Sequence, residues 1–204
     1  MEIVKKKSSE NYKGVPYVTT LLSTSLWTLY GAVDPDDGVL IVTVNSVGIA
    51  SQAAYLLLFL FYASKERKVK YLGLVVLELL FLGIVIAATL GVFHGDLRRT
   101  FVGVLCATFT IAMYAAPLSA VRNVVRTKSV EYMPFWLCLS LVVNAAVWFS
   151  FAMLLKDYYV LVPNAVGIVF GSLQLSVYFV YNTKSDKLGV KEEDLEQPPN
   201  QLAS

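Results

Sequence analysis

The chain has 204 residues, of which 56% are hydrophobic and only 16% are charged. This composition is too apolar for an ordinary soluble domain, so we expect an integral membrane protein. The net charge is only +2, and no basic stripe interleaved with aromatic residues is present, so a nucleic-acid partner is not expected.

Six apolar stretches follow one another along the chain, each near the roughly 20 residues that a helix needs to cross a hydrocarbon core about 30 Å thick. In chain order they are residues 16–33, 39–62, 71–93, 101–125, 134–155 and 159–181. Each stretch is continuously apolar rather than alternating between apolar and polar residues, which predicts helices and not a β-barrel. The predicted fold class is therefore all-α integral membrane, with six transmembrane helices.

Positive charge divides the connections between these helices into two groups. Of the 17 lysine and arginine residues, 14 lie before the first helix, between helices two and three, between helices four and five, or after the sixth. Only Arg98, Arg99 and Lys156 lie in the alternate connections. Because cytosolic segments carry the excess of lysine and arginine, both termini are predicted to be cytosolic. The polar residues 182–204 are predicted to form a disordered cytosolic tail.

The sequence repeats itself at an offset of 119 residues, at which VNSVGI (residues 44–49) matches PNAVGI (residues 163–168). The helices before these two runs share a tryptophan four residues after a small polar residue, at positions 27 and 148. One period contains four helices, an even number, so the two repeats must point the same way across the membrane. Parallel repeats of this kind occur in transporters, with the substrate at the repeat interface near the midplane.

The repeat predicts four parts of the chain. Residues 1–62 form an incomplete first repeat of two helices, residues 71–93 a linker helix, residues 101–181 a second repeat of three helices, and residues 182–204 the tail. A symmetric protein would have three helices, a linker and three more helices. The first repeat is therefore predicted to lack its first helix, with residues 1–7 as the last stub of it.

Residues capable of chemistry are few and scattered. Cys106 and Cys138 lie inside apolar stretches without metal-ligand spacing, and His94 is the sole histidine, in a loop. We therefore predict no metal site, no cofactor and no catalytic residues, hence not an enzyme. Glu78 is the one carboxylate well inside a stretch, and it is either a structural residue near the preceding lysines or a proton-coupling group.

Several long motifs, in the correct order, resemble the plant SWEET sugar transporters over nearly the whole membrane region. The motifs are KS followed by GVPY (residues 7–17), LWTLYG (26–31), TVN (43–45), MYAAPLS (113–119), KSVEYMPFW (128–136) and VPN (162–164). Short motifs such as ENY (10–12) and SLWT (25–28) most resemble those of the vacuolar, fructose- and hexose-associated branch of this family. The resemblance implies the vacuolar membrane (tonoplast), with the plasma membrane as the alternative.

The same resemblance implies which residues act. The sugar pocket would be formed by Ser23, Trp27, Asn45, Met113, Asn144, Trp148 and Asn164. The hinges would be Pro16, Pro117 and Pro134, and a non-cytosolic gate would involve Tyr30 and Asp157. Amides that donate and accept, together with flat aromatic faces, suit an uncharged hexose. Asn144 and Met113 look like the residues of hexose-transporting members.

These residues also have structural interpretations. The tryptophans could be interfacial anchors, and the asparagines could hydrogen-bond neighbouring helices. Ser23 could be a small packing residue, while Pro16 and Pro134 stand at helix starts, where proline is simply a good first residue.

Three functional hypotheses follow. The first is bidirectional, facilitative transport (uniport) of monosaccharides, glucose or fructose, by alternating access, which the resemblance implies needs neither ATP nor an ion gradient. The second is a transport-inactive truncated subunit that oligomerises with full-length relatives and modulates them. The third is a proton-coupled carrier of another small solute that uses Glu78. The expected partners are a monosaccharide, the lipid bilayer and related transporters in a homo- or hetero-oligomer.

Overall fold

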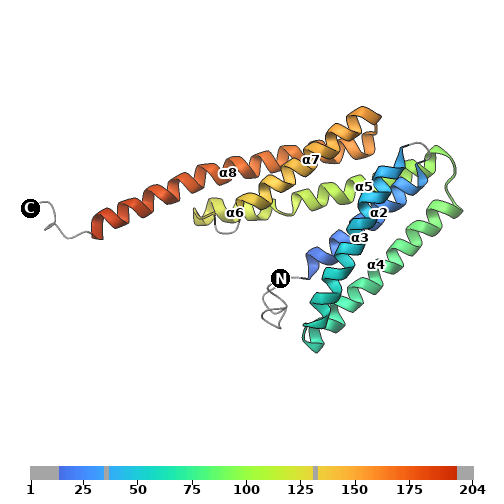
Figure 1. Ribbon diagram of the computed structural model, residues 1–204, viewed down its shortest axis with the longest axis horizontal. Coiled ribbons are helices and arrows are strands. Elements are labelled where there is room, and N and C mark those ends of the chain that lie inside the picture. Colours follow the sequence, from blue (N-terminus) through green and yellow to red (C-terminus); the bar gives the residue numbers. More distant parts are fainter. Residues whose placement is uncertain (1–13, 35–36, 131–132, 197–204) are drawn as a thin grey trace, which may run out of the picture. The chain divides into compact units, whose positions relative to one another are not determined.

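The computed structural model describes residues 14–34, 37–130 and 133–196, with side chains up to residue 182. The elements are helices α2 (Val15–Val33), α3 (Gly38–Phe61), α4 (Lys65–Gly91), α5 (Asp96–Ala115), α6 (Leu118–Thr127), α7 (Phe135–Leu155) and α8 (Tyr158–Glu196) (Figure 1). The prediction of an all-α chain is confirmed over these residues. Residues 1–13 and 197–204 lie outside the described residues. They include the predicted remnant of a helix at residues 1–7 and the end of the tail.

Every predicted apolar stretch is helical in the structure, and most helix ends agree within one or two residues. Among the described residues, five helical segments are long and apolar enough to cross a membrane, by length and composition. They are Gly38–Phe61, Lys65–Gly91, Asp96–Thr127, Phe135–Leu155 and Tyr158–Asn182. Helix α8 continues beyond the last predicted stretch to Glu196, and the disorder of residues 182–204 stays a prediction.

Helix α2 is long enough but is not among these five segments, because its many hydroxyl groups lower its mean hydropathy. It has 19 residues, of which six are serine or threonine. Four of the hydroxyls donate to the carbonyl one turn earlier: Thr19 to Val15, Thr24 to Thr20, Ser25 to Leu21 and Thr28 to Thr24. These hydroxyls are therefore satisfied within the helix itself and need no partner from the bilayer.

The predicted helix over residues 101–125 is divided into α5 and α6 at Ala116 and Pro117. Proline has no N–H and clashes with the preceding turn, so the helical ladder stops there. The Ala116 N–H still donates to the Ala112 carbonyl at 3.1 Å, and the Ala120 N–H starts α6 by donating to the Pro117 carbonyl at 2.9 Å. The interruption thus follows from the proline.

The helix that was predicted to be a linker begins earlier than the apolar pattern indicates. Helix α4 begins at Lys65, six residues before the predicted start at residue 71. Its first turns contain the basic residues of the second connection, and lysine, arginine and glutamate are all good helix formers. The apolar pattern, residues 71–93, predicted only the part of this helix that is apolar enough to lie in lipid. It did not predict the polar first turns.

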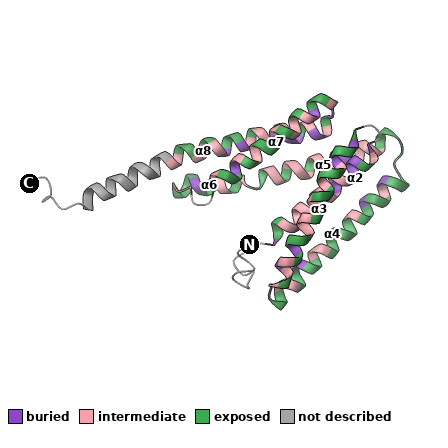
Figure 2. Ribbon diagram, in the orientation of Figure 1, coloured by how far each residue is buried: buried purple, intermediate pink, exposed green. Residues whose placement is uncertain are grey.

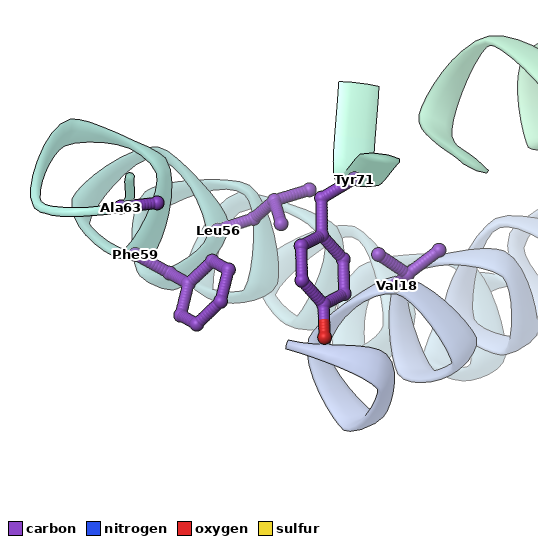
Figure 3. Close-up of a cluster of buried hydrophobic side chains, with 5 residues drawn as sticks. All are labelled: Val18, Leu56, Phe59, Ala63 and Tyr71. Carbon is purple, nitrogen blue, oxygen red and sulfur yellow. The ribbon is translucent and has the colours of Figure 1, made fainter. Parts of the chain in front are cut away.

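The chain forms two compact units, residues 1–109 and 110–204. In the first unit, α2 packs along α3 and against α4, around a cluster that includes Val18, Leu56, Phe59 and Tyr71 (Figure 3). The Tyr71 ring lies between Leu56 and Val18 in this view, and its hydroxyl accepts a hydrogen bond from the Gly14 N–H at 3.2 Å. Tyr71 therefore fixes the start of α2 against α4.

The linker helix α4 has one buried stripe and a broad exposed surface (Figure 2). Tyr71, Glu78 and Val85 are buried and spaced seven residues apart, so they lie on one face. The exposed side chains between them are apolar, such as Leu80 and Ile84, as expected for a surface that faces lipid.

The second unit is held together by small residues on α7. Cys138, Ala145 and Ala152 are buried and also seven residues apart, on the helix that packs along α8. On α8, a Cβ added to Gly171 would collide with the Val142 side chain. Small residues at such contacts let two helix backbones approach closely, which is a common way for helices to associate in membranes.

Candidate functional site

The first unit positions three of the predicted pocket residues on two adjacent helices. Ser23 and Trp27 lie one turn apart on α2, Asn45 lies on α3, and all three are half-buried. The Trp27 ring packs edge-on against the Tyr30 ring, with centroids 5.4 Å apart. The Asn45 amide nitrogen donates to the Ile41 carbonyl at 2.8 Å, which orients the amide and uses one of its two hydrogens.

The second unit positions the other four pocket residues. Met113 lies on α5, Asn144 and Trp148 lie one turn apart on α7, and Asn164 is buried on α8. The Asn164 amide nitrogen donates to the Val160 carbonyl at 2.7 Å. This is the bond that Asn45 makes at the repeat-related position, so the repeat extends to the hydrogen bonding of its asparagines.

Tyr114 is a residue of this site that the sequence-based analysis missed. Its hydroxyl lies 3.3 Å from the Asn164 carbonyl oxygen and also hydrogen-bonds the Asn144 side chain. Tyr114 therefore connects two predicted pocket residues that lie on different helices. Its place beside Met113 in the MYAAPLS motif was the available signal, although the pairing itself spans 50 residues.

The predicted gate residue Tyr30 is fully buried and held by an arginine from α5. The Arg99 Nε donates to the Tyr30 hydroxyl at 3.1 Å, and the guanidinium carbon lies 5.8 Å from the ring centroid. Arg99 also forms an ion pair with Asp34, with 3.2 Å between Nη2 and Oδ2. This cluster of Asp34, Arg99 and Tyr30 ties the end of α2 to α5, and only the charge count had singled out Arg99.

The other predicted gate residue, Asp157, lies in the second unit and caps helix α8. Its side chain is buried, and its Oδ1 accepts the N–H groups of Tyr159 at 3.0 Å and Val160 at 3.3 Å. An aspartate at this position satisfies amides that otherwise have no helical partner. The gate role of Tyr30 and Asp157 stays a prediction.

The three predicted hinge prolines occupy two kinds of position. Pro117 interrupts a membrane-spanning segment. Pro16 lies in the first turn of α2, and Pro134 is the residue that precedes α7. At a helix start the missing N–H costs no helical hydrogen bond. Of these three prolines, only Pro117 therefore interrupts a helix, and all three hinge roles stay predictions.

Histidine, cysteine and acidic residues do not gather at this site. Within residues 14–34, 37–130 and 133–182, they form no group of three or more that could hold a metal ion. Cys106 and Cys138 are buried, free thiols in different units.

Arg99→Met is expected to destabilise the first unit by about 2 kcal/mol, because the buried Asp34 carboxylate loses its ion-pair partner and Tyr30 loses a donor. Thermal melting of the detergent-purified protein measures this effect. The matched control is Arg122→Met on the exposed face of α6, which should leave the melting temperature nearly unchanged. The double variant Asp34→Asn/Arg99→Met should lose less stability than the two single losses added together. Equal melting of the Arg99 and Arg122 variants would show that the cluster is not stabilising.

Comparison with known families gives one match that covers most of the chain. A family model described as "Sugar efflux transporter for intercellular exchange" matches residues 1–67 and 100–186. The unmatched interval, residues 68–99, contains most of α4, the helix predicted to be a linker.

Similar proteins include the bidirectional sugar transporter SWEET16 of Oryza sativa subsp. japonica, 48% identical over 92% of this chain and 57% of the relative. Bidirectional sugar transporter SWEET17 of Arabidopsis thaliana is 45% identical over 88% of this chain and 75% of the relative. The chain thus spans little more than half of the rice relative's length.

A solved structure of a eukaryotic SWEET transporter matches with a TM-score of 0.83 and 38% sequence identity. The match covers 89% of this chain and 86% of the solved chain. At this level of identity and coverage, the predicted all-α membrane fold is confirmed.

Proposed function

Since the chain belongs to the SWEET family of sugar transporters, which are transporters and not enzymes, we propose that it carries monosaccharides, glucose or fructose, down their gradient in both directions. The proposed transport is a uniport by alternating access. The observation that carries the proposal is the matching pair of asparagines, Asn45 and Asn164. Each is oriented by a bond from its amide nitrogen to its own helix, at 2.8 Å and 2.7 Å.

The chemistry of the pocket residues supports an uncharged, hydroxyl-rich substrate. An oriented amide that has used one hydrogen still offers a second hydrogen and a carbonyl lone pair. A sugar hydroxyl donates and accepts at once, so it can use both. Trp27 and Trp148 add flat apolar faces for the C–H surfaces of a sugar ring. None of the seven pocket residues is charged, which favours a neutral solute.

The break in the helix at Pro117 supports alternating access. Pro117 separates α5 from α6 within one membrane-spanning segment, four residues after the pocket residue Met113. A segment without a continuous hydrogen-bond ladder bends more easily than an intact helix. We propose that Pro117 lets α6 move relative to α5 as the site changes its exposure, with Pro16 and Pro134 as further hinges and Tyr30 and Asp157 as the non-cytosolic gate.

The proposed location is the vacuolar membrane, with both termini in the cytosol. The resemblance of motifs such as ENY (10–12) and SLWT (25–28) to the vacuolar branch supports the choice of membrane, and the distribution of lysine and arginine supports the orientation. We further propose that the chain works in an oligomer with itself or with related transporters.

The experiment that tests the function is uptake of labelled glucose and fructose into vesicles reconstituted with the purified chain. We expect saturable flux in both directions that needs no ATP and no pH gradient. The counter-flow form of the assay, in which unlabelled hexose inside speeds entry of labelled hexose, identifies a carrier. No flux from the chain alone, but altered flux when it is mixed with a full-length relative, would favour the modulating subunit instead.

Glu78 gives a specific reason to keep proton coupling as the second candidate. Its side chain is buried on α4, and its Oε2 has no hydrogen-bond partner within the described part of the chain. The flux assay separates the two mechanisms. For a uniporter, Glu78→Gln should transport hexose at the wild-type rate, with or without a pH gradient. Flux that follows the pH gradient and is lost in Glu78→Gln would favour a proton-coupled carrier.

A further inference from the structure

We infer that Tyr114 is a positioning residue of the proposed sugar site, which fixes the amides of Asn144 and Asn164 through one directed hydrogen-bond chain. The inference rests on the proposed function, because the site is the one proposed above. It adds a residue that lies outside the seven predicted pocket positions and assigns it a role in substrate selection.

In this series of three hydrogen bonds, the direction of each bond follows from the direction of the one before it. The Asn164 nitrogen is 2.7 Å from the Val160 carbonyl, which can only accept, so this end of the amide must be the NH₂ group. The Asn164 oxygen therefore faces the Tyr114 hydroxyl at 3.3 Å, and the hydroxyl must donate to it. The Tyr114 oxygen can then only accept from Asn144, so the Asn144 NH₂ group donates.

These hydrogen bonds leave a defined set of donors and acceptors free for a ligand. Asn164 retains one hydrogen and one carbonyl lone pair, and Asn144 retains its carbonyl oxygen and one hydrogen. The terminal torsion of an asparagine side chain is broad when nothing holds it. Because Tyr114 holds both amides at once, the site does not lose that rotational freedom on binding, which favours affinity and selectivity.

Gly167 allows the Tyr114 ring to reach Asn164. Gly167 lies three residues after Asn164, on the same side of α8. A Cβ at this position would lie 2.6 Å from the Tyr114 ring carbon that bears the hydroxyl. The glycine therefore makes room for the tyrosine at the point where its hydroxyl meets the amide.

Among the described residues of the first unit, Gly48, the repeat counterpart of Gly167, lies against a threonine and not a tyrosine. A Cβ at Gly48 would meet the Thr24 methyl group at 2.9 Å. Among the described residues, only the Ile41 carbonyl hydrogen-bonds the Asn45 side chain. The two asparagines thus share the bond to their own helix, but only Asn164 is held by a second one.

The test compares Tyr114→Phe with Tyr178→Phe in the vesicle flux assay. Tyr114→Phe keeps the ring and removes only the hydroxyl. Tyr178 belongs to the same unit, its ring packs against Phe135 and Phe179, and its hydroxyl makes no hydrogen bond to the described residues, so Tyr178→Phe is the matched control. We expect Tyr114→Phe to raise KM for hexose about 10-fold with little change in maximal rate. It should also reduce discrimination against singly deoxygenated hexoses, while Tyr178→Phe retains wild-type values.

Three outcomes would overturn the inference. If the wild-type chain carries hexose and Tyr114→Phe keeps the wild-type KM and selectivity, Tyr114 does not position the site, and the proposed function stands. An equal KM increase in both variants would indicate a general loss of packing. A wild-type chain that neither binds nor carries hexose would remove the proposed function together with this inference.

A second variant covers the case in which Tyr114→Phe is not recovered as folded protein. Gly167→Ala keeps the hydroxyl but displaces the ring from Asn164, and it should raise KM and weaken deoxy-sugar discrimination in the same way. Wild-type KM and selectivity in Gly167→Ala would overturn the inference. Gel filtration of each purified variant verifies that the compared proteins are folded.

Discussion

Asn164→Ala is expected to reduce hexose flux to roughly 1% or less of wild type. Sites built to hydrogen-bond a substrate hydroxyl lose factors of this order when the pairing is removed. The substitution removes both groups that the amide offers to a sugar. It also leaves the Tyr114 hydroxyl without its acceptor at 3.3 Å. Initial rates of labelled glucose and fructose entry into vesicles, normalised to protein content, measure the effect.

The matched control for this prediction is Asn123→Ala. Asn123 is an exposed residue of α6, and its backbone carbonyl accepts a hydrogen bond from the Thr127 hydroxyl at 2.9 Å. The backbone contact survives the substitution, so flux should match wild type. Trp148→Ala should lose flux as Asn164→Ala does, because the aromatic face of the site is removed. Wild-type flux in either pocket variant would show that the pocket is assigned to the wrong residues.

Gly38→Ala is expected to have the largest effect on stability, a loss of about 3 kcal/mol or enough to prevent folding. A Cβ at Gly38 would overlap the Gly31 carbonyl oxygen, and a Cβ at Gly31 would lie 2.8 Å from the Gly38 carbonyl oxygen. These neighbours are backbone atoms, so no side-chain rotation can relieve the collision. Helices α2 and α3 would have to move apart beside the turn that joins them.

Gly83→Ala makes the same chemical change where space is open. A Cβ at Gly83, in the middle of α4, has no heavy atom within 4 Å. Because alanine is a better helix former than glycine, the variant should match wild type or gain up to about 1 kcal/mol. Melting temperature and the yield of monodisperse protein measure both variants. Similar behaviour of the two alanine variants would contradict the close contact between α2 and α3.

The helices and most of their ends could be predicted from the amino-acid sequence. Residues 39–62 were predicted and Gly38–Phe61 is helical, and residues 134–155 were predicted and Phe135–Leu155 is helical. This works because in lipid each backbone polar group must be satisfied within its own segment, so a long apolar run permits little else. The start of α4 at Lys65 departed from the pattern, because a helix can continue into polar residues beyond the bilayer.

The motifs also identified the family and the asparagine and tryptophan positions, since these recur at fixed spacing within the chain. The repeat predicted that Asn45 and Asn164 correspond. The structure then revealed that both donate to the carbonyl one turn earlier, a contact that is local and therefore follows from the helix alone.

Contacts between side chains far apart in the sequence became known only from the structure. Tyr114 meets Asn164 across 50 residues, and Arg99 meets Tyr30 across 69. The hydropathy pattern does not predict such pairs, because a membrane helix can be apolar on every face. The rotation of each helix about its own axis depends instead on contacts between small residues, such as Gly31 with Gly38. The seven pocket residues therefore stay a prediction from the sequence, whereas the tyrosine hydroxyl that hydrogen-bonds two of them was found only in the structure.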